Sequence, residues 1–238
     1  MLKKLLISIP VESNGDITAK LADWLLRVVV EPHRLGPNWA VRWDIVHDKP
    51  VAATRNRQVK RFLESDNDYV LFLDSDMVPD DESIGRLCKA IARDDIDVVT
   101  GMADRLTENG PMPVIFEYKN NFTGARLNHA LLELDPTTGP FPLENAGTGA
   151  AVLMCTRDSL QRIWDDGRVW FKDVLCEDPK SEKFGLGIIG QDSWFWIQCH
   201  QLKIKAWVDT DAYIGHIKPS NLQQEAIRLH QARLSKGA

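Results

Sequence analysis

The stretch that decides the fold is YVLFLDSDMVP, Tyr69–Pro79. Val70–Asp74 has the pattern of a buried strand that ends in a charge, and a second acid, Asp76, follows after one residue. Adjacent carboxylates repel each other, so a divalent cation is their natural partner. The alternative is a polar turn in which Asp76 or Asp80 caps the next helix. The pair therefore predicts either a ligand site or a capped turn at the end of this strand.

Around this strand, apolar runs typical of strands alternate with helical patterns. We expect strands over 5–10, 41–48, 68–76 and 97–103, and helices over 18–30, 52–65 and 80–95. This order predicts an α/β fold with a mostly parallel sheet and helices on both faces. Ligands bind outside the carboxyl ends of the strands in such sheets, which is where Asp74 and Asp76 lie.

The second half of the chain is less regular, and several prolines and glycines lie between residues 107 and 145. We expect strands over 113–119, 146–155 and 205–216, helices over 158–164, 191–204 and 220–236, and a polar, then glycine-rich loop over 177–190. We find no linker that cuts the chain, so residues 1–238 are predicted to form a single domain.

The composition indicates an ordinary globular protein. The 238 residues are 44% hydrophobic and 26% charged, and the net charge of -5 argues against broad nucleic-acid binding. None of the four cysteines forms a C-x-x-C pair, so we expect free thiols in a reducing cytoplasm. The apolar run at the N-terminus stops at Pro10, which favours a first strand over a leader, and no stretch is long enough to span a membrane.

Three segments together resemble the GT-A-fold glycosyltransferases, most nearly the inverting family 2-like branch. They are PVAATRNRQVKRFLESDNDYVLFLDSDMVPDDESIGRL (50–87), ENAGTGAAVLM (144–154) and GIIGQDSWFWIQCHQLKIKAWVDTDAYIGH (187–216). The first is similar to a helix with an R-N pair, a strand ending in D-x-D and an acidic helix start. The last is similar to the family's G-E-D helix and closing strand with a histidine.

The resemblance implies a GT-A-type, Rossmann-like three-layer sandwich. Residues of about 1–104 would form its nucleotide-sugar-binding half, and residues of about 105–238 its acceptor-binding and catalytic half. It also implies a glycosyltransferase that uses Mn²⁺, or Mg²⁺, to move a sugar from a UDP- or GDP-sugar to a hydroxyl acceptor, with inversion. The glycine-rich segment 184–190 would be a lid that orders over the donor, or simply a surface loop.

Residue roles follow from the same resemblance. Asp76 would bind the metal directly, Asp74 would contact the metal or the ribose, and His216 would complete the metal site or be an ordinary strand-end histidine. The residues expected to contact the nucleotide donor are Pro10, Val11, Ser13, Asp48, Arg55, Asn56, Asp74 and Ser75. Three further basic residues of the same helix, Arg57, Lys60 and Arg61, are expected to form a solvated face.

Asp192 is the candidate general base, because an inverting transfer needs a carboxylate to deprotonate the acceptor. The family commonly has Glu-Asp here, whereas this chain has Gln191-Asp192, which leaves the acceptor open. The alternative for Asp192 is a helix N-cap, which would lower its pKa and weaken it as a base. Trp194 and Trp196 flank it and would be an acceptor platform or core residues.

Two other functions stay open. The sequence DSDMV also fits the D-x-D-x-T/V motif of haloacid-dehalogenase-type phosphatases, in which the first aspartate, here Asp74, is the nucleophile. That motif normally lies on the first strand, whereas two strand–helix units precede it here. The remaining alternative is a non-catalytic module that binds a nucleotide or a glycan.

Overall fold

The computed structural model describes residues 2–11, 15–107, 110–113, 115–118, 129–131, 140–177 and 186–216, with the side chains of some strand residues, His216 among them, left undescribed. The helices are α1 (Ala19–Val30), the 3-10 helix η1 (Pro32–Leu35), α2 (Val51–Glu64), α3 (Asp81–Ile91), α4 (Arg157–Asp165) and α5 (Gln191–Gln201). The strands of the central sheet are β1 (Lys3–Val11), β2 (Trp39–His47), β3 (Tyr69–Leu73), β5 (Val98–Met102), β10 (Phe141–Pro142), β12 (Val152–Thr156) and β15 (Ala206–Tyr213). The shorter strands are β4 (Met77–Val78), β6 (Asp104–Thr107), β7 (Gly110–Pro113), β8 (Ile115–Tyr118), β9 (His129–Leu131), β11 (Ala146–Thr148), β13 (Val174–Glu177), β14 (Leu186–Ile189) and β16 (Gly215–His216).

The central sheet has seven strands in the order β10-β15-β5-β12-β3-β1-β2. Strands β1, β2 and β3 are parallel, and so are β5 and β15. Strand β12 lies between β3 and β5 and is antiparallel to both, and β10 is antiparallel to β15. Five strands therefore run in one direction and two in the other, which confirms the predicted α/β sandwich with a mostly parallel sheet.

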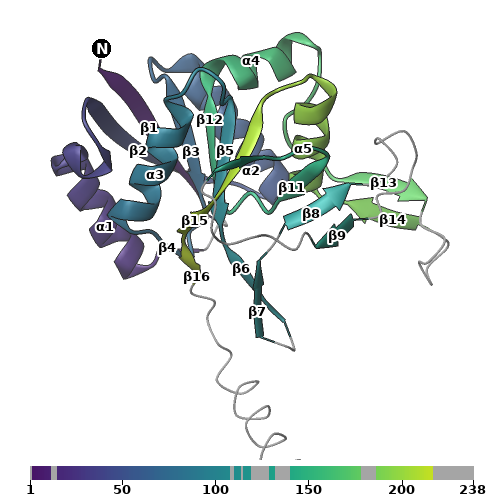
Figure 1. Cartoon of the computed structure of the whole chain (residues 1–238), viewed down its shortest axis with the longest axis horizontal. Helices are drawn as coiled ribbons and strands as arrows, with labels where there is room; N and C mark the ends of the chain where they lie inside the picture. Colours follow the sequence, from purple (N-terminus) through teal and green to yellow (C-terminus); the bar gives the residue numbers. More distant parts are fainter. Residues whose placement is uncertain are drawn as a thin grey trace, which may run out of the picture.

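Helices cover both faces of this sheet, as Figure 1 shows. Alternate residues of each central strand enter different cores: Leu71 and Leu73 pack with α1 and α3, whereas Val70 and Phe72 pack with α2, α4 and α5. This period of two is what a strand buried on both sides requires. The apolar run before Asp74 is thus explained by two cores that share one strand.

Side-chain caps set the starts of three helices. Thr18, Asp80 and Thr156 precede α1, α3 and α4, and each side-chain oxygen accepts a hydrogen bond from a backbone N–H of the first turn. Asp81 and Glu82 place negative charge in the first turn of α3, as the sequence predicted.

Two predictions for the second half were wrong in detail. Residues 146–155 form two strands, because the chain leaves the small sheet of β8, β9 and β11 after Thr148 and enters the central sheet at Val152. Part of the predicted loop 177–190 is strand β14, which pairs with β13 in a two-stranded antiparallel sheet. The predicted helix 220–236 lies outside the described residues, and so do residues 184 and 185 of the predicted lid. The rest of that lid is β14 and Gly190, the residue before α5.

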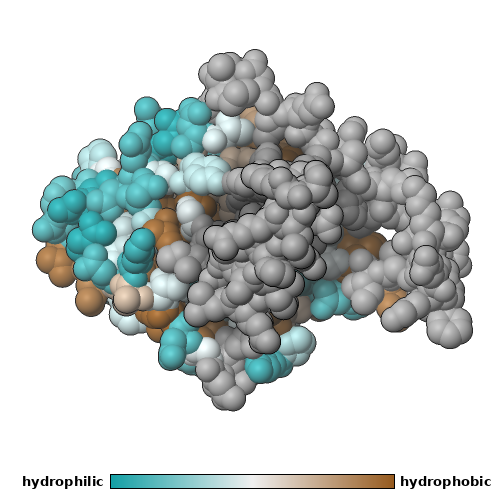
Figure 2. Space-filling view, turned by 90° about the horizontal axis from the view of Figure 1, so that it is seen from below, coloured by the Kyte–Doolittle hydropathy of each residue, from teal (hydrophilic) through white to brown (hydrophobic). Residues whose placement is uncertain are grey.

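The described surface beside α1 and β2 is largely hydrophilic, with separate apolar residues among it (Figure 2). Exposed apolar side chains such as Leu26 and Val30 of α1 are scattered as in most proteins. Within the part of the chain that the structure describes, no helix is both long and apolar enough to cross a membrane. Cys88, Cys155 and Cys199 are buried free thiols, as predicted.

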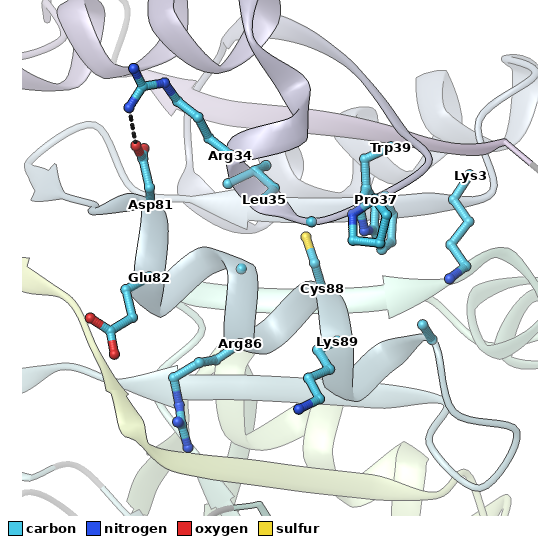
Figure 3. Close-up of a pocket in the computed structure, with 13 residues that line it drawn as sticks. Lys3, Arg34, Leu35, Pro37, Trp39, Asp81, Glu82, Arg86, Cys88 and Lys89 are labelled. Carbon is cyan, nitrogen blue, oxygen red and sulfur yellow. Dashed lines mark hydrogen bonds and ion pairs between the residues drawn. The ribbon is translucent and has the colours of Figure 1, made fainter.

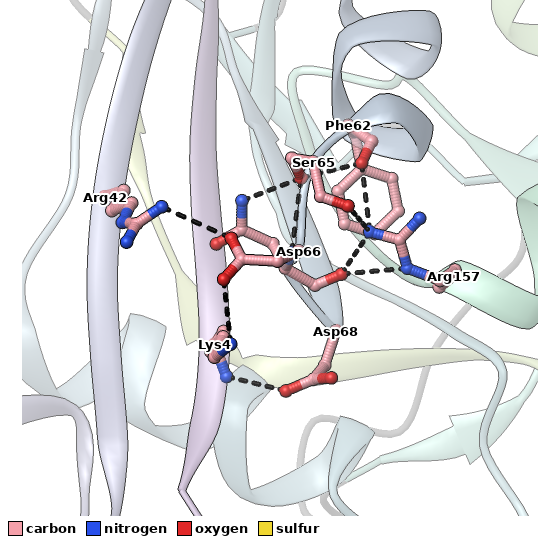
Figure 4. A network of polar contacts seen from close by, with 8 residues as sticks. Lys4, Arg42, Phe62, Ser65, Asp66, Asp68 and Arg157 are labelled. Atoms are coloured by element: carbon pink, nitrogen blue, oxygen red, sulfur yellow. Dashed lines mark hydrogen bonds and ion pairs between the residues drawn. The ribbon is translucent and has the colours of Figure 1, made fainter.

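Arg157 fastens α4 to the end of α2 at the start of β3 (Figure 4). Its guanidinium donates to the backbone carbonyls of Phe62, Leu63, Ser65 and Asn67 at 2.6–3.1 Å. These carbonyls belong to the last turn of α2 and the residues after it, where a positive charge also complements the helix dipole. The guanidinium lies 4.8 Å from the centre of the Phe62 ring.

We predict that Arg157→Ala lowers the free energy of unfolding by about 3 kcal/mol, because several carbonyls lose a charged donor at once. Arg157→Lys should lose part of this stability, since an ammonium cannot reproduce the planar fork. Urea denaturation would measure both changes. Arg42→Ala is the control, because Arg42 is 70% exposed and its ion pair with Asp66 is a surface one. Equal denaturation midpoints for Arg157→Ala and Arg42→Ala would contradict this account.

Candidate functional site

The two aspartates of the predicted site lie in a tight turn between β3 and β4. The N–H of Asp74 donates to the carbonyl of Ala151 at 2.9 Å, and the N–H of Met77 donates to the carbonyl of Asp74 at 3.1 Å. The turn therefore reverses the chain at the carboxyl end of β3, and Asp74–Asp76 occupy the position that the sequence predicted.

The capping alternative holds for Asp80 and not for Asp76. The carboxylate of Asp80 accepts hydrogen bonds from the N–H and the hydroxyl of Ser83, both at 2.7 Å. Helix α3 thus has its cap without Asp76. The predicted ligand role of Asp76 stays a prediction.

Arg55 is the charged centre of this region. Its side chain is 2% exposed, and its Nη2 donates to Oδ1 of Asp74, which is 32% exposed, at 2.8 Å. The guanidinium also lies 5.6 Å from the centre of the Phe171 ring. Its Nε and Nη1 have no hydrogen-bond partner among the described residues. In this structure Arg55 forms a buried ion pair with Asp74. Its predicted contact with a nucleotide stays a prediction.

Asp192 is not the N-cap of α5. Gly190 holds that position, and Asp192 is the second residue of the helix. Burial raises the pKa of the Asp192 carboxyl, the positive charge of Arg55 and the N–H of Ala150 lower it, and Asp173 raises it, with a net increase. The capping interpretation, which required a lowered pKa, is therefore wrong. A carboxylate with a raised pKa is better suited to accept a proton.

The break between β11 and β12 connects the two acidic groups. The carbonyl of Ala151 accepts from Asp74, and the N–H of Ala150 donates to the carboxylate of Asp192. The added Cβ of a residue other than glycine at position 149 would lie 4.0 Å from Oδ2 of Asp192. Three consecutive small residues thus separate the D-x-D turn from the candidate base, and sequence reasoning, which treated them as strand, missed this role.

Aromatic side chains pack closely against β11, the short strand before the break. A Cβ added to Gly147 would lie 2.5 Å from Cγ of Trp196 and 2.7 Å from the hydroxyl of Tyr118, so only glycine fits there. The indole N–H of Trp196 donates to the carbonyl of Thr148 at 2.7 Å. Trp196 is fully buried, which assigns it to the core rather than to an acceptor platform.

The predicted histidine comes back to the D-x-D turn through the backbone. Strand β16 pairs antiparallel with β4, with His216 opposite Met77. This register places His216 beside the residue that follows Asp76. Among the side chains that the structure describes, which do not include that of His216, no group of three metal-ligating residues is found. Metal binding by Asp74, Asp76 and His216 therefore stays a prediction, and the backbone register is compatible with it.

The described residues expected at the nucleotide lie in β1, just after β2, in α2 and in the turn after β3. Pro10 and Val11 end β1, and the N–H of Thr18, at the start of α1, donates to the carbonyl of Ser75 at 3.3 Å. The start of α1 and the D-x-D turn are thereby near neighbours. Ser13 lies outside the described residues.

Two further residues that were expected to contact the nucleotide, Asp48 and Asn56, bind other parts of the protein in this structure. Asp48 forms an ion pair with Arg57 at 2.8 Å. The amide of Asn56 donates to the carbonyl of Phe171 at 2.8 Å and accepts from its N–H at 3.0 Å. Asn56 thus ties α2 to the segment after α4, a function that its sequence gave no sign of. Arg57, Lys60 and Arg61 are at least half exposed, which confirms the predicted solvated face.

Two open grooves lie away from these residues. One of about 410 Å³ is lined by η1, α3 and the amino ends of β1 and β2 (Figure 3), where Arg34 and Asp81 form an ion pair at 3.1 Å. Another of about 610 Å³ lies at the β10–β15 edge and includes His200 and Trp207. Neither contains a predicted site residue, and the first is at the wrong end of the sheet for the chemistry of such folds.

Comparisons with known proteins give no family. No family model and no curated protein matches the chain. Among solved structures, the chain is similar to "Crystal Structure of A197 from STIV", with 19% identity and a TM-score of 0.49 over 87% of this chain and 82% of that one. It is also similar to a glycosyltransferase involved in the glycosylation of the major capsid of PBCV-1, with 10% identity and a TM-score of 0.41 over 96% and 99%. No residue role is taken from either structure at these values.

We predict that Asp192→Asn stabilises the isolated protein at neutral pH. An aspartate with a raised pKa binds more protons when folded than when unfolded, so stability falls as pH rises from its ordinary pKa through its raised one. Each unit of pKa is worth about 1.4 kcal/mol, and each kcal/mol about 2–4 °C in Tm for a chain of this size.

Thermal melts of the wild type and of Asp192→Asn across the acid range would test this. The variant should melt higher at neutral pH, and the two curves should converge below about pH 4, where the wild-type carboxyl is protonated in both states. A variant that melts lower at neutral pH would show that the ionised carboxylate is net stabilised instead.

Proposed function

We propose that this chain is a metal-dependent glycosyltransferase that moves a sugar from a nucleotide diphosphate donor to a hydroxyl acceptor with inversion. The observation that carries the proposal is the pairing of a D-x-D turn at a strand end with Asp192, a partly buried carboxylate of raised pKa, across Gly149–Ala151. The D-x-D turn is suited to bind a cation and, through it, a diphosphate. Asp192 is suited to accept a proton.

Each residue would then have a distinct task. Asp76 and His216, brought together by the β4–β16 register, would hold the cation together with Asp74. A divalent ion bound there supplies charge neutralisation for the leaving diphosphate. Arg55 would hold Asp74 in place through their ion pair from its buried position. Asp192 would accept the proton of the acceptor hydroxyl as its oxygen attacks C1.

The test is donor hydrolysis in the absence of an acceptor. We expect the protein, with Mn²⁺ and a panel of UDP- and GDP-sugars, to release nucleoside diphosphate from one donor. Asp76→Asn and EDTA should each lower the rate roughly 100-fold, since they remove electrostatic stabilisation of the leaving group. Asp23→Asn is the matched control, because Asp23 is an exposed aspartate of α1 that pairs with Arg27.

The outcomes separate the three candidate functions. Release that Asp76→Asn abolishes and Asp23→Asn leaves intact would support the transferase. A rise in Tm with UDP or GDP and Mn²⁺ but no release from any donor would indicate a binding module. No response to any nucleotide, with hydrolysis of a general phosphatase substrate that Asp74→Asn abolishes, would favour the phosphatase.

A further inference from the structure

Asp173 is an acidic residue of this region that no sequence pattern singled out. It is exposed, lies just before β13, and its Oδ1 accepts a hydrogen bond from the N–H of Gln191 at 2.9 Å. Gln191 is the first residue of α5, and the N-cap, Gly190, has no side chain with which to cap the helix. Asp173 therefore takes over part of the cap from a distant segment, and this holds its carboxylate next to Asp192.

Gln191 joins the two carboxylates. Its backbone N–H binds Asp173, and its side-chain amide donates a short hydrogen bond to Oδ1 of Asp192. The charges that act on Asp192 come from Arg55 of α2 and from Asp173, with Tyr118 of β8 as the neighbouring phenol. Asp192 is thus influenced by one fixed cation on its inner side and one exposed carboxylate on its outer side.

This arrangement keeps a second acid beside Asp192 although residue 191 is a glutamine. A glutamate at position 191 would place a negative charge directly on Asp192, whereas the glutamine amide stabilises its ionised form by donating a hydrogen bond. The second acid is still present, but it comes from Asp173 instead of from the helix. Only one oxygen of Asp173 is used in binding the N–H of Gln191, so the other can accept from a ligand hydroxyl.

Trp194 adds an aromatic face to the same corner. It lies one turn after Gln191 on α5, is partly exposed, and its indole N–H donates to the carbonyl of Val169 at 3.0 Å. This bond fixes the ring against the segment that carries Asp173. A carboxylate that accepts from hydroxyls, next to an indole face, suits a ligand with several hydroxyls on an apolar ring face. Two acids at the same place disfavour a phosphate-rich acceptor.

We propose that Asp173 binds the acceptor by accepting a hydrogen bond from one of its hydroxyls, and that the acceptor is a carbohydrate stacked on Trp194. This inference rests on the proposed function. In the transfer step, the acceptor oxygen forms a bond to C1 of the donor sugar and its proton passes to Asp192. The bond between C1 and the diphosphate oxygen breaks, and the diphosphate leaves with the electron pair.

The test uses the full chain, Mn²⁺ and the donor that hydrolysis identifies, with a set of methyl hexopyranosides as acceptor probes. Asp173→Asn keeps an oxygen for the N–H of Gln191 and removes only the charge. We expect the acceptor KM to rise about tenfold or more, as for the loss of a hydrogen bond to a charged group. The ratio of transfer to hydrolysis should fall accordingly.

The pH profile separates this role from simple capping. Loss of a nearby negative charge lowers the pKa of Asp192, so the acid limb of kcat/KM for transfer should move to lower pH in Asp173→Asn. Asp158→Asn is the control, because Asp158 is a 74% exposed acid in the first turn of α4. It should leave the acceptor KM, the ratio and the pH profile unchanged.

Three other outcomes would each contradict the inference or the function on which it rests. An unchanged acceptor KM and pH profile in Asp173→Asn would reduce Asp173 to a cap and overturn the inference. Donor hydrolysis without transfer to any hexopyranoside would overturn the carbohydrate acceptor while leaving the transferase intact. Absence of hydrolysis with every donor would refute the proposed function itself, and the inference would fall with it.

Discussion

The contact on which the rest of the site depends is the buried ion pair between Arg55 and Asp74. A guanidinium that is almost completely removed from water is costly unless carboxylates and an aromatic face surround it. Asp74 at the end of β3 supplies an ion pair, Phe171 in the segment after α4 supplies the aromatic face, and Asp192 of α5 is a further acidic neighbour. One buried charge on α2 thereby fixes the relative positions of three elements that are far apart in sequence.

The break between β11 and β12 also contributes to the site, through backbone groups that contact Asp74 and Asp192. A continuous strand over these residues would have satisfied its backbone groups within one sheet. Where the chain changes sheets, the carbonyl of Ala151 accepts from the backbone N–H of Asp74 and so continues the pairing of β12 with β3. The N–H of Ala150 donates to the carboxylate of Asp192 instead of to a strand. The backbone here runs close to Asp192, since a Cβ added at Gly149 would lie 4.0 Å from Oδ2 of that residue. The irregularity of the second half of the chain is thus what builds the site.

The sequence was sufficient for those features that depend on local patterns. Continuous apolar runs predicted β3 and its neighbours, and the acids of α3 predicted its start. The position of β12 between β3 and β5 had no local signal, because an apolar run does not record its partners or its direction. The contacts of Asn56 and Asp173 were hidden for the same reason, since both bind backbone groups of distant segments.

The misjudged cap of α5 has a physical cause of its own. Sequence position alone made Asp192 a natural capping residue, whereas in the structure Gly190 is the N-cap and part of the capping comes from Asp173. A carboxylate released from capping is free to titrate at a higher pKa. Predicting this would have required knowledge of which segment packs against the helix start, information that only the folded chain contains.

The place of β15 and β16 has a consequence for the order of events during synthesis. Strand β15 covers the edge of β5, and β16 covers β4 next to the D-x-D turn, yet both come from the last part of the described chain. A nascent chain that has not yet emerged beyond Ile204 exposes two unpaired strand edges, which are prone to wrong association. Chaperone contacts during translation are therefore most useful to this protein late, just before its final strands leave the ribosome.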